Sequence, residues 1–268
     1  MVRVRSSSTQ LPAYVPGRKL PGVADRLTEL AGGVSRYPDM GAGSSEVCGR
    51  LLHSVVGPGD EVVVGRRSFE AYPILTAVAG GTAVRVPLRD HALNLDAMAA
   101  AITGRTRLVF VRNPNDPTST AVGERALGEF ADRVPDDLAG LRVGYCVAPP
   151  ELAAQVRKTQ VPFSVSALAQ EAAVVALGER AEVVRRSALT VAERERVTLR
   201  LRALGFEVPD SQADFVWLPL AEESADFAVH CLDGKAVVRP FPGEGVRVTI
   251  GLPEENDALL ALAAAWRG

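Results

Sequence analysis

Lysine is scarce in this chain of 268 residues, and Lys19, Lys158 and Lys235 are the only three. Any chemistry that requires a lysine amine must therefore use one of these side chains. Arginine supplies the remaining positive charge, and the formal net charge is only -2. A balance so close to neutral gives no electrostatic bias towards nucleic acid or an anionic membrane surface.

Cysteine, histidine and long apolar runs are also sparse. Cys48, Cys146 and Cys231 are scattered without CxxC spacing, which predicts buried, reduced thiols in a cytoplasmic protein. The histidines form no metal-binding motif, so we expect no metal site. No apolar run reaches the roughly 18 residues that a membrane span requires. Residues 1–5 carry charge but are not followed by the apolar core of a secretory signal.

The order of the expected elements indicates an α/β fold. Strands are expected at residues 61–65, 83–87, 107–112 and 141–147, and helices at 68–78 and 95–102. A further helix is expected to open within residues 41–47 and to run to about residue 56. Buried strands that alternate with helices predict a mostly parallel sheet that is covered on both faces.

From residue 166 the pattern changes. Helices are expected at residues 167–177, 181–204, 224–232 and 253–266, and strands at 214–218, 236–239 and 246–250. Gly205 is expected to end the second of these helices at the C′ position. We therefore predict an N-terminal arm (1–33), a large domain (34–165) and a smaller α+β C-terminal domain (166–268).

Four tracts contain residues suited to anion binding. Residues 41–47, GAGSSEV, open a helix whose free backbone N–H groups could hold a phosphate, although a plain helix cap has the same composition. Residues 113–118, NPNDPT, follow a predicted strand, where open α/β sheets bind ligands. Arg142 in LAGLRVGY and Arg247 in FPGEGVRVTIG have planar guanidinium groups, which pair well with phosphate and carboxylate.

These tracts, together with RYPD at residues 36–39, occur in the order found in a known family. The chain resembles the fold-type I aminotransferases that use pyridoxal 5'-phosphate, particularly the histidinol-phosphate aminotransferase group and its actinobacterial branch assigned to aromatic amino acids. The resemblance implies a PLP-transferase-like large domain that here lacks central strands. It also implies amino-group transfer between an amino acid and a 2-oxo acid, in a homodimer.

The resemblance assigns eight residues to ligand binding. Those expected at the cofactor are Tyr37, Ala42, Gly43, Ser44, Phe69, Asp116 and Arg142, and Arg247 is expected at the substrate carboxylate. Phe69 would stack on the pyridine ring, and Tyr37 would reach the phosphate of the neighbouring subunit. The family has asparagine where this chain has Asp116, and that asparagine donates a hydrogen bond to an anionic cofactor oxygen. An ionised aspartate offers only acceptors.

Three stretches are short compared with the family: after Gly22, between Asp39 and Gly41, and between Val134 and Leu138. The lysine that attaches the cofactor and the acid that protonates its ring nitrogen belong to the last and largest gap. We therefore predict an aminotransferase homologue that is impaired or inactive as written, with no covalently attached cofactor and no catalytic residue of its own. Two alternatives stay open: an active transaminase whose sequence here omits segments, and a non-catalytic binding or dimerisation module.

Overall fold

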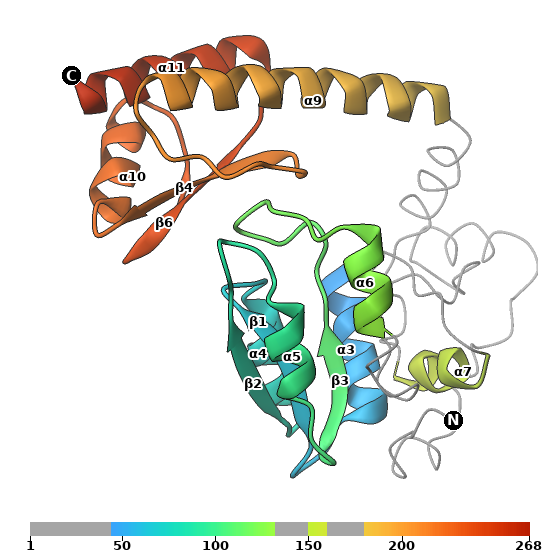
Figure 1. Cartoon of the computed structure of the whole chain (residues 1–268). Helices are drawn as coiled ribbons and strands as arrows, with labels where there is room; N and C mark the ends of the chain where they lie inside the picture. The colour runs from blue at the N-terminus through green and yellow to red at the C-terminus, as the bar shows by residue number, and fades with distance from the viewer. Residues whose placement is uncertain (1–43, 132–149, 160–179) are drawn as a thin grey trace, which may run out of the picture.

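The computed structural model describes residues 44–131, 150–159 and 180–268, and the following account concerns these residues (Figure 1). The elements in chain order are α3 (Ser44–Val55), β1 (Glu61–Arg66), α4 (Ala71–Val78), β2 (Thr82–Pro87), α5 (Leu95–Ala100), β3 (Thr106–Phe110), α6 (Glu124–Ala131), α7 (Pro150–Lys158), α9 (Arg180–Ala203), β4 (Phe215–Ala221), α10 (Ser224–Asp233), β5 (Arg239–Phe241), β6 (Glu244–Thr249) and α11 (Pro253–Arg267).

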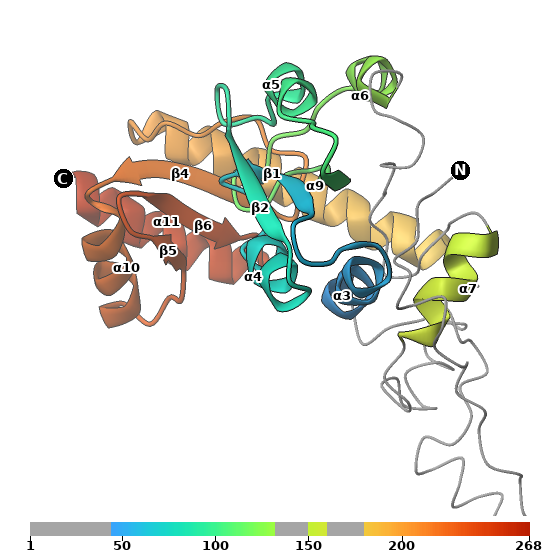
Figure 2. The same ribbon diagram turned by 90° about the horizontal axis from the view of Figure 1, so that it is seen from below.

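The first sheet has three parallel strands in the order β2-β1-β3. Val62 and Val64 of β1 pack against α3, α4 and α7, whereas Val63 packs against α5 and α6 on the opposite face. Figure 2 shows these helices on the two sides of the strands. Covering both faces explains why β1 is a continuous apolar run. The predicted α/β class is thereby confirmed.

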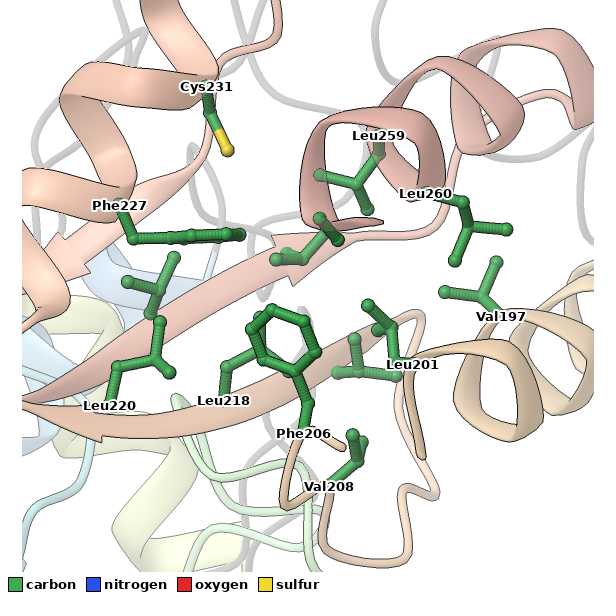
Figure 3. Close-up of a cluster of buried hydrophobic side chains, with 14 of the residues drawn as sticks. Val197, Leu201, Phe206, Val208, Leu218, Leu220, Phe227, Cys231, Leu259 and Leu260 are labelled. Atoms are coloured by element: carbon green, nitrogen blue, oxygen red, sulfur yellow. The ribbon is translucent and has the colours of Figure 1, made fainter. Parts of the chain in front are cut away.

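The second sheet is antiparallel, with the strand order β4-β6-β5. Helices α9, α10 and α11 cover one face, where Leu201 and Phe227 belong to the core shown in Figure 3. Side chains of a strand alternate between faces, so Val216 and Leu218 enter this core while Trp217 points to the other face. Within the described ranges no helix of the second unit covers that other face, and the first unit lies against it.

The end of α9 was predicted correctly from Gly205. This glycine has a φ of 85°, and its N–H donates to the carbonyl of Arg202 at 3.0 Å. The N–H of Phe206 donates to the carbonyl of Leu201 at 3.1 Å. Together these bonds satisfy carbonyls that the last helical turn would otherwise leave unpaired.

Two elements begin three residues later than predicted. A strand was expected at residues 236–239, but β5 begins at Arg239, because the N–H groups of Lys235 and Ala236 donate to Leu232 and Cys231 at the end of α10. A helix was expected from residue 68, but α4 begins at Ala71. The residues before α4 form a turn instead, and this turn contributes to the site described below.

Several predictions concern residues outside the described ranges, among them the strand at 141–147 and the helix at 167–177. The proposed boundaries near residues 33 and 165 also lie there, so the division into domains stays a prediction. Among the described residues, no helix is both long and apolar enough to span a membrane. Nor do those residues contain a group of histidine, cysteine and acidic side chains that could hold a metal ion.

Candidate functional site

The candidate site lies where the carboxyl ends of β1 and β3 meet the helix-free face of the second sheet (Figure 1). The turn at residues 67–70 follows β1, and the loop at residues 113–120 follows β3. Contacts join both segments to the second unit: the carbonyl of Ser119 accepts from the N–H of Gln212 at 2.9 Å, for example. Parallel sheets commonly place their ligand-binding loops at this edge.

Hydrogen bonds of two asparagines hold the loop after β3. Asn115 is buried, and its Nδ2 donates to the carbonyl of Arg67 at 3.0 Å, which ties the loop to the turn after β1. The side chain of Asn113 pairs with both backbone groups of Val122, at 2.9 and 3.0 Å. The loop therefore has a defined path, and it places Asp116 against the second sheet.

Asp116 forms ion pairs with two arginines at the centre of the site. Its Oδ2 lies 3.0 Å from Nη1 of Arg112, and its Oδ1 accepts a hydrogen bond from Nη1 of Arg247 at 2.9 Å. The Asp116 side chain is only 8 % exposed. Water screens such a pair less than it screens a surface pair. The three side chains together carry a formal charge of +1.

Aromatic rings lie next to both arginines. The guanidinium carbon of Arg112 lies 5.0 Å from the ring centre of Phe69, and that of Arg247 lies 5.1 Å from the ring centre of Phe215. Tyr72 meets Phe69 edge to face, with the ring centres 5.3 Å apart. These separations are within the range of favourable cation–π contacts. Cationic groups and flat apolar surfaces therefore stand side by side.

The structure brings together three of the eight predicted site residues. Phe69, Asp116 and Arg247 come from separate segments. Asp116 pairs with Arg247, and Arg112, which the sequence analysis missed, joins Asp116 to Phe69. The spacing of Arg112, four residues before Asp116 at the end of a predicted strand, could have indicated it. Ser44 is the first residue of α3. The remaining four, Tyr37, Ala42, Gly43 and Arg142, lie outside the described residues.

The prediction that Asp116 would present acceptors is consistent with its surroundings, but the partners differ from those expected. It was expected to face an anionic oxygen, and instead both of its oxygens pair with guanidinium groups. The N–H of Arg247 at Nε is buried and has no hydrogen-bond partner among the described residues. A buried donor without a partner is costly, and a ligand oxygen would satisfy it once the side chains that cover Nε move aside.

Neither described lysine belongs to the segments that build the site. Lys158 is the last residue of α7, a helix that packs against α3, and Lys235 follows the end of α10. Lys19 lies outside the described residues.

A second group of ion pairs also joins the two units. Glu244 of β6 accepts hydrogen bonds from Nε of Arg67 at 2.8 Å and from Nη2 of Arg66 at 2.9 Å. These hydrogen bonds, that from Arg67 above all, lower the pKa of Glu244 to about 2 despite the opposing effect of burial. Arg239 pairs with Glu70, and the ring of Phe241 lies 5.2 Å from the guanidinium carbons of both Arg67 and Arg239.

The family profile described as aminotransferase class I and II matches residues 5–136 and 137–262. The chain belongs to this aminotransferase family. It is 40% identical to the aromatic amino acid aminotransferase of Mycobacteroides abscessus, over 99% of each chain. It is also 40% identical to the enzyme of that name from Thermobifida fusca, over 98% of this chain and 97% of the relative. The predicted relationship is thereby confirmed.

Solved structures show the same fold. The histidinol-phosphate aminotransferase of Sinorhizobium meliloti in complex with pyridoxal-5'-phosphate has a TM-score of 0.76 and 18% identity, covering 91% of this chain and 80% of that chain. A protein of Erwinia carotovora, described as a putative histidinol-phosphate aminotransferase, has a TM-score of 0.75 and 18% identity, covering 91% and 84%. At such identities the likeness concerns the fold alone. The expectation of a PLP-dependent family is confirmed at the level of the family.

The alignments also confirm that this aminotransferase-family chain is shorter internally than its relatives. The alignment with the M. abscessus enzyme spans 344 positions, whereas the chain has 268 residues, so at least 76 positions of the relative have no counterpart. These positions are internal, because the alignment covers 99% of both chains. The family profile matches in two pieces that meet between residues 136 and 137, within the largest predicted gap.

The described residues do not fit pyridoxal 5'-phosphate as the resemblance would require. Arg112 lies over the ring of Phe69, which was expected to stack on the pyridine. Asp116 replaces a donor by an acceptor, and both of its oxygens are already paired. What these residues can do is bind an anion beside an aromatic surface.

Proposed function

We propose that this chain is an aminotransferase-family protein that binds the carboxylate of an aromatic amino acid or 2-oxo acid at Arg247. As the 268-residue chain, it does not complete the amino-group transfer for which its relatives are named. Arg247 carries the proposal, since its guanidinium is stacked on Phe215 and has a buried Nε without a partner among the described residues.

Carboxylate binding follows from the chemistry of Arg247. A guanidinium presents donors in a planar fork that matches two carboxylate oxygens, and such charge-assisted bonds are stronger than neutral ones. One donor of Arg247 is engaged by Asp116, and another is buried and unpaired. Phe215 and Phe69 already contact Arg247 and Arg112 with one face each, so an aromatic side chain would meet the remaining edges of these rings. The names of the curated relatives support the same substrate class.

The proposed loss of transfer rests on the lysines. The chemistry requires a lysine amine at the cofactor to attach it and to move the substrate proton. None of the three lysines belongs to a segment that supplies Phe69, Asp116 or Arg247. We further propose a cytoplasmic homodimer, with Tyr37 reaching across the subunit interface as the family resemblance implies.

Titration calorimetry with 3-phenylpropionate, an unreactive aromatic monocarboxylate, tests the binding proposal. Saturable binding to the wild-type chain is expected, with a loss of at least tenfold in affinity for Arg247→Gln. Arg239→Gln is a matched control, because Arg239 pairs with Arg247 in strand register but forms its ion pair with Glu70. Absence of binding to the wild type, or equal loss in both variants, would contradict the proposal.

A second experiment tests the absence of transfer. The protein is incubated with pyridoxal 5'-phosphate, reduced with borohydride and mapped by mass spectrometry. We expect no modification of a lysine above that of an unfolded control, and no transamination of phenylalanine. Specific labelling of Lys158 with turnover would instead establish an active transaminase, while turnover only in a polypeptide of larger intact mass would establish that segments are omitted here.

A further inference from the structure

We propose that Asp116 is an internal carboxylate that competes with the ligand for Arg247 and so determines the charge of the ligand that binds. This inference rests on the proposed carboxylate site at Arg247. In this role Asp116 is a specificity-determining residue: it favours an aromatic monocarboxylate over a dicarboxylate. No covalent step is involved.

The competition follows from the position of Asp116. Its Oδ1 is 2.9 Å from Nη1 of Arg247, the distance of a charge-assisted hydrogen bond, and the pair is largely buried. A ligand carboxylate that binds Arg247 with both oxygens needs two donors of the fork, and Asp116 already holds one. The ligand must therefore either displace Asp116 from Nη1 of Arg247 or bind to the unpaired Nε alone.

Displacing Asp116 does not leave it without a partner, because Arg112 holds the other oxygen at 3.0 Å. Arg112 is in turn positioned by the ring of Phe69, 5.0 Å from its guanidinium carbon. The carboxylate can therefore remain on Arg112 while Arg247 takes the ligand. Such an exchange leaves no buried charge without an opposite charge beside it, a situation that would carry a large free-energy penalty.

The charge count gives the specificity. Arg112, Asp116 and Arg247 sum to +1, which one ligand carboxylate neutralises. A second ligand carboxylate would add a negative charge next to Asp116, where like charges repel strongly at low dielectric constant. With asparagine at this position the sum becomes +2, and both arginines could bind ligand carboxylates.

Calorimetry with 3-phenylpropionate and phenylsuccinate, an aromatic dicarboxylate, tests the inference on the wild type, Asp116→Asn and Asp210→Asn. The Asp210 variant is the control, because this residue is exposed and forms its ion pair with Arg202 and not with Arg247. For the wild type we expect at least tenfold tighter binding of the monocarboxylate. For Asp116→Asn we expect at least tenfold tighter binding of the monocarboxylate than in the wild type and a larger gain for the dicarboxylate.

Equal affinities of wild type and Asp116→Asn, with binding still lost in Arg247→Gln, would overturn the role of Asp116 and leave the proposed function standing. If neither ligand bound any variant, both proposals would fall. Should Asp116→Asn not fold, the wild type alone decides: equal or tighter binding of the dicarboxylate would overturn the inference.

Discussion

Glu244 offers a direct test of how the two units are held together. Its carboxylate accepts hydrogen bonds from Arg66 at the end of β1 and from Arg67 in the turn that follows, although it belongs to β6 of the other sheet. Glu244→Gln keeps the shape of the side chain and removes its charge. The free energy of unfolding should fall at neutral pH, because two arginines lose their shared counter-ion.

The size of this loss in unfolding free energy follows from the pKa and the exposure of Glu244. A carboxyl whose pKa drops from 4.5 to about 2 on folding would contribute about 3 kcal/mol at neutral pH if the drop were fully realised. Water screens this site, however, since the side chains of Glu244 and Arg66 are 28 % and 45 % exposed. We therefore expect a loss of about 1–2 kcal/mol for Glu244→Gln.

The sign of the pH dependence is also determined. Because the pKa of Glu244 is lower in the folded chain than in the unfolded one, its contribution is complete above the unfolded value of 4.5. The contribution is lost as the pH falls from 4.5 towards about 2. The difference between wild type and Glu244→Gln should therefore be constant from pH 7 to pH 5 and shrink below that.

Urea unfolding at a series of pH values measures this difference, with the fluorescence of Trp217 and Trp266 as the signal. Glu182→Gln is the control. Glu182 also pairs with two arginines and its pKa is lowered to about 2, chiefly by the hydrogen bond from Arg185, but all its partners are exposed on α9. An equal effect of both variants, or a Glu244 effect that grows in acid, would refute the reasoning.

Two further predictions concern the second unit. Phe227 is fully buried between Phe206 and Trp266, so Phe227→Ala should lower the free energy of unfolding in urea by about 3–5 kcal/mol. Val229 is 58 % exposed on the same helix, so Val229→Ala should lower it by less than about 0.5 kcal/mol. Similar losses for the two variants would contradict the packing. Burial raises the pKa of the Cys231 thiol to about 11, so this thiol should resist alkylation at pH 8 until urea unfolds the chain. Peptide-resolved mass spectrometry measures the labelling, and labelling of Cys231 at the rate of a free peptide would contradict its burial.

Much of the secondary structure could be predicted from local pattern. The apolar run 61–65, covered on both faces, reads as a buried strand, and Gly205 marks the end of α9 because few other residues tolerate its positive φ. One error occurred where a long-range side-chain contact determines the path. The turn before α4 is tied by Asn115, whose partner Arg67 is 48 positions away in sequence.

The sequence by itself determined the family, because the tracts and their order are preserved and are local properties of the chain. It also determined that only three lysines exist, from which the predicted loss of transfer follows. The tertiary structure alone decided what Asp116 does. Its two partners include Arg247, which is 131 positions away, and no local pattern records which charges a fold brings within 3 Å. The same holds for Arg112, which belongs to the site only because Phe69 and Asp116 lie on either side of it.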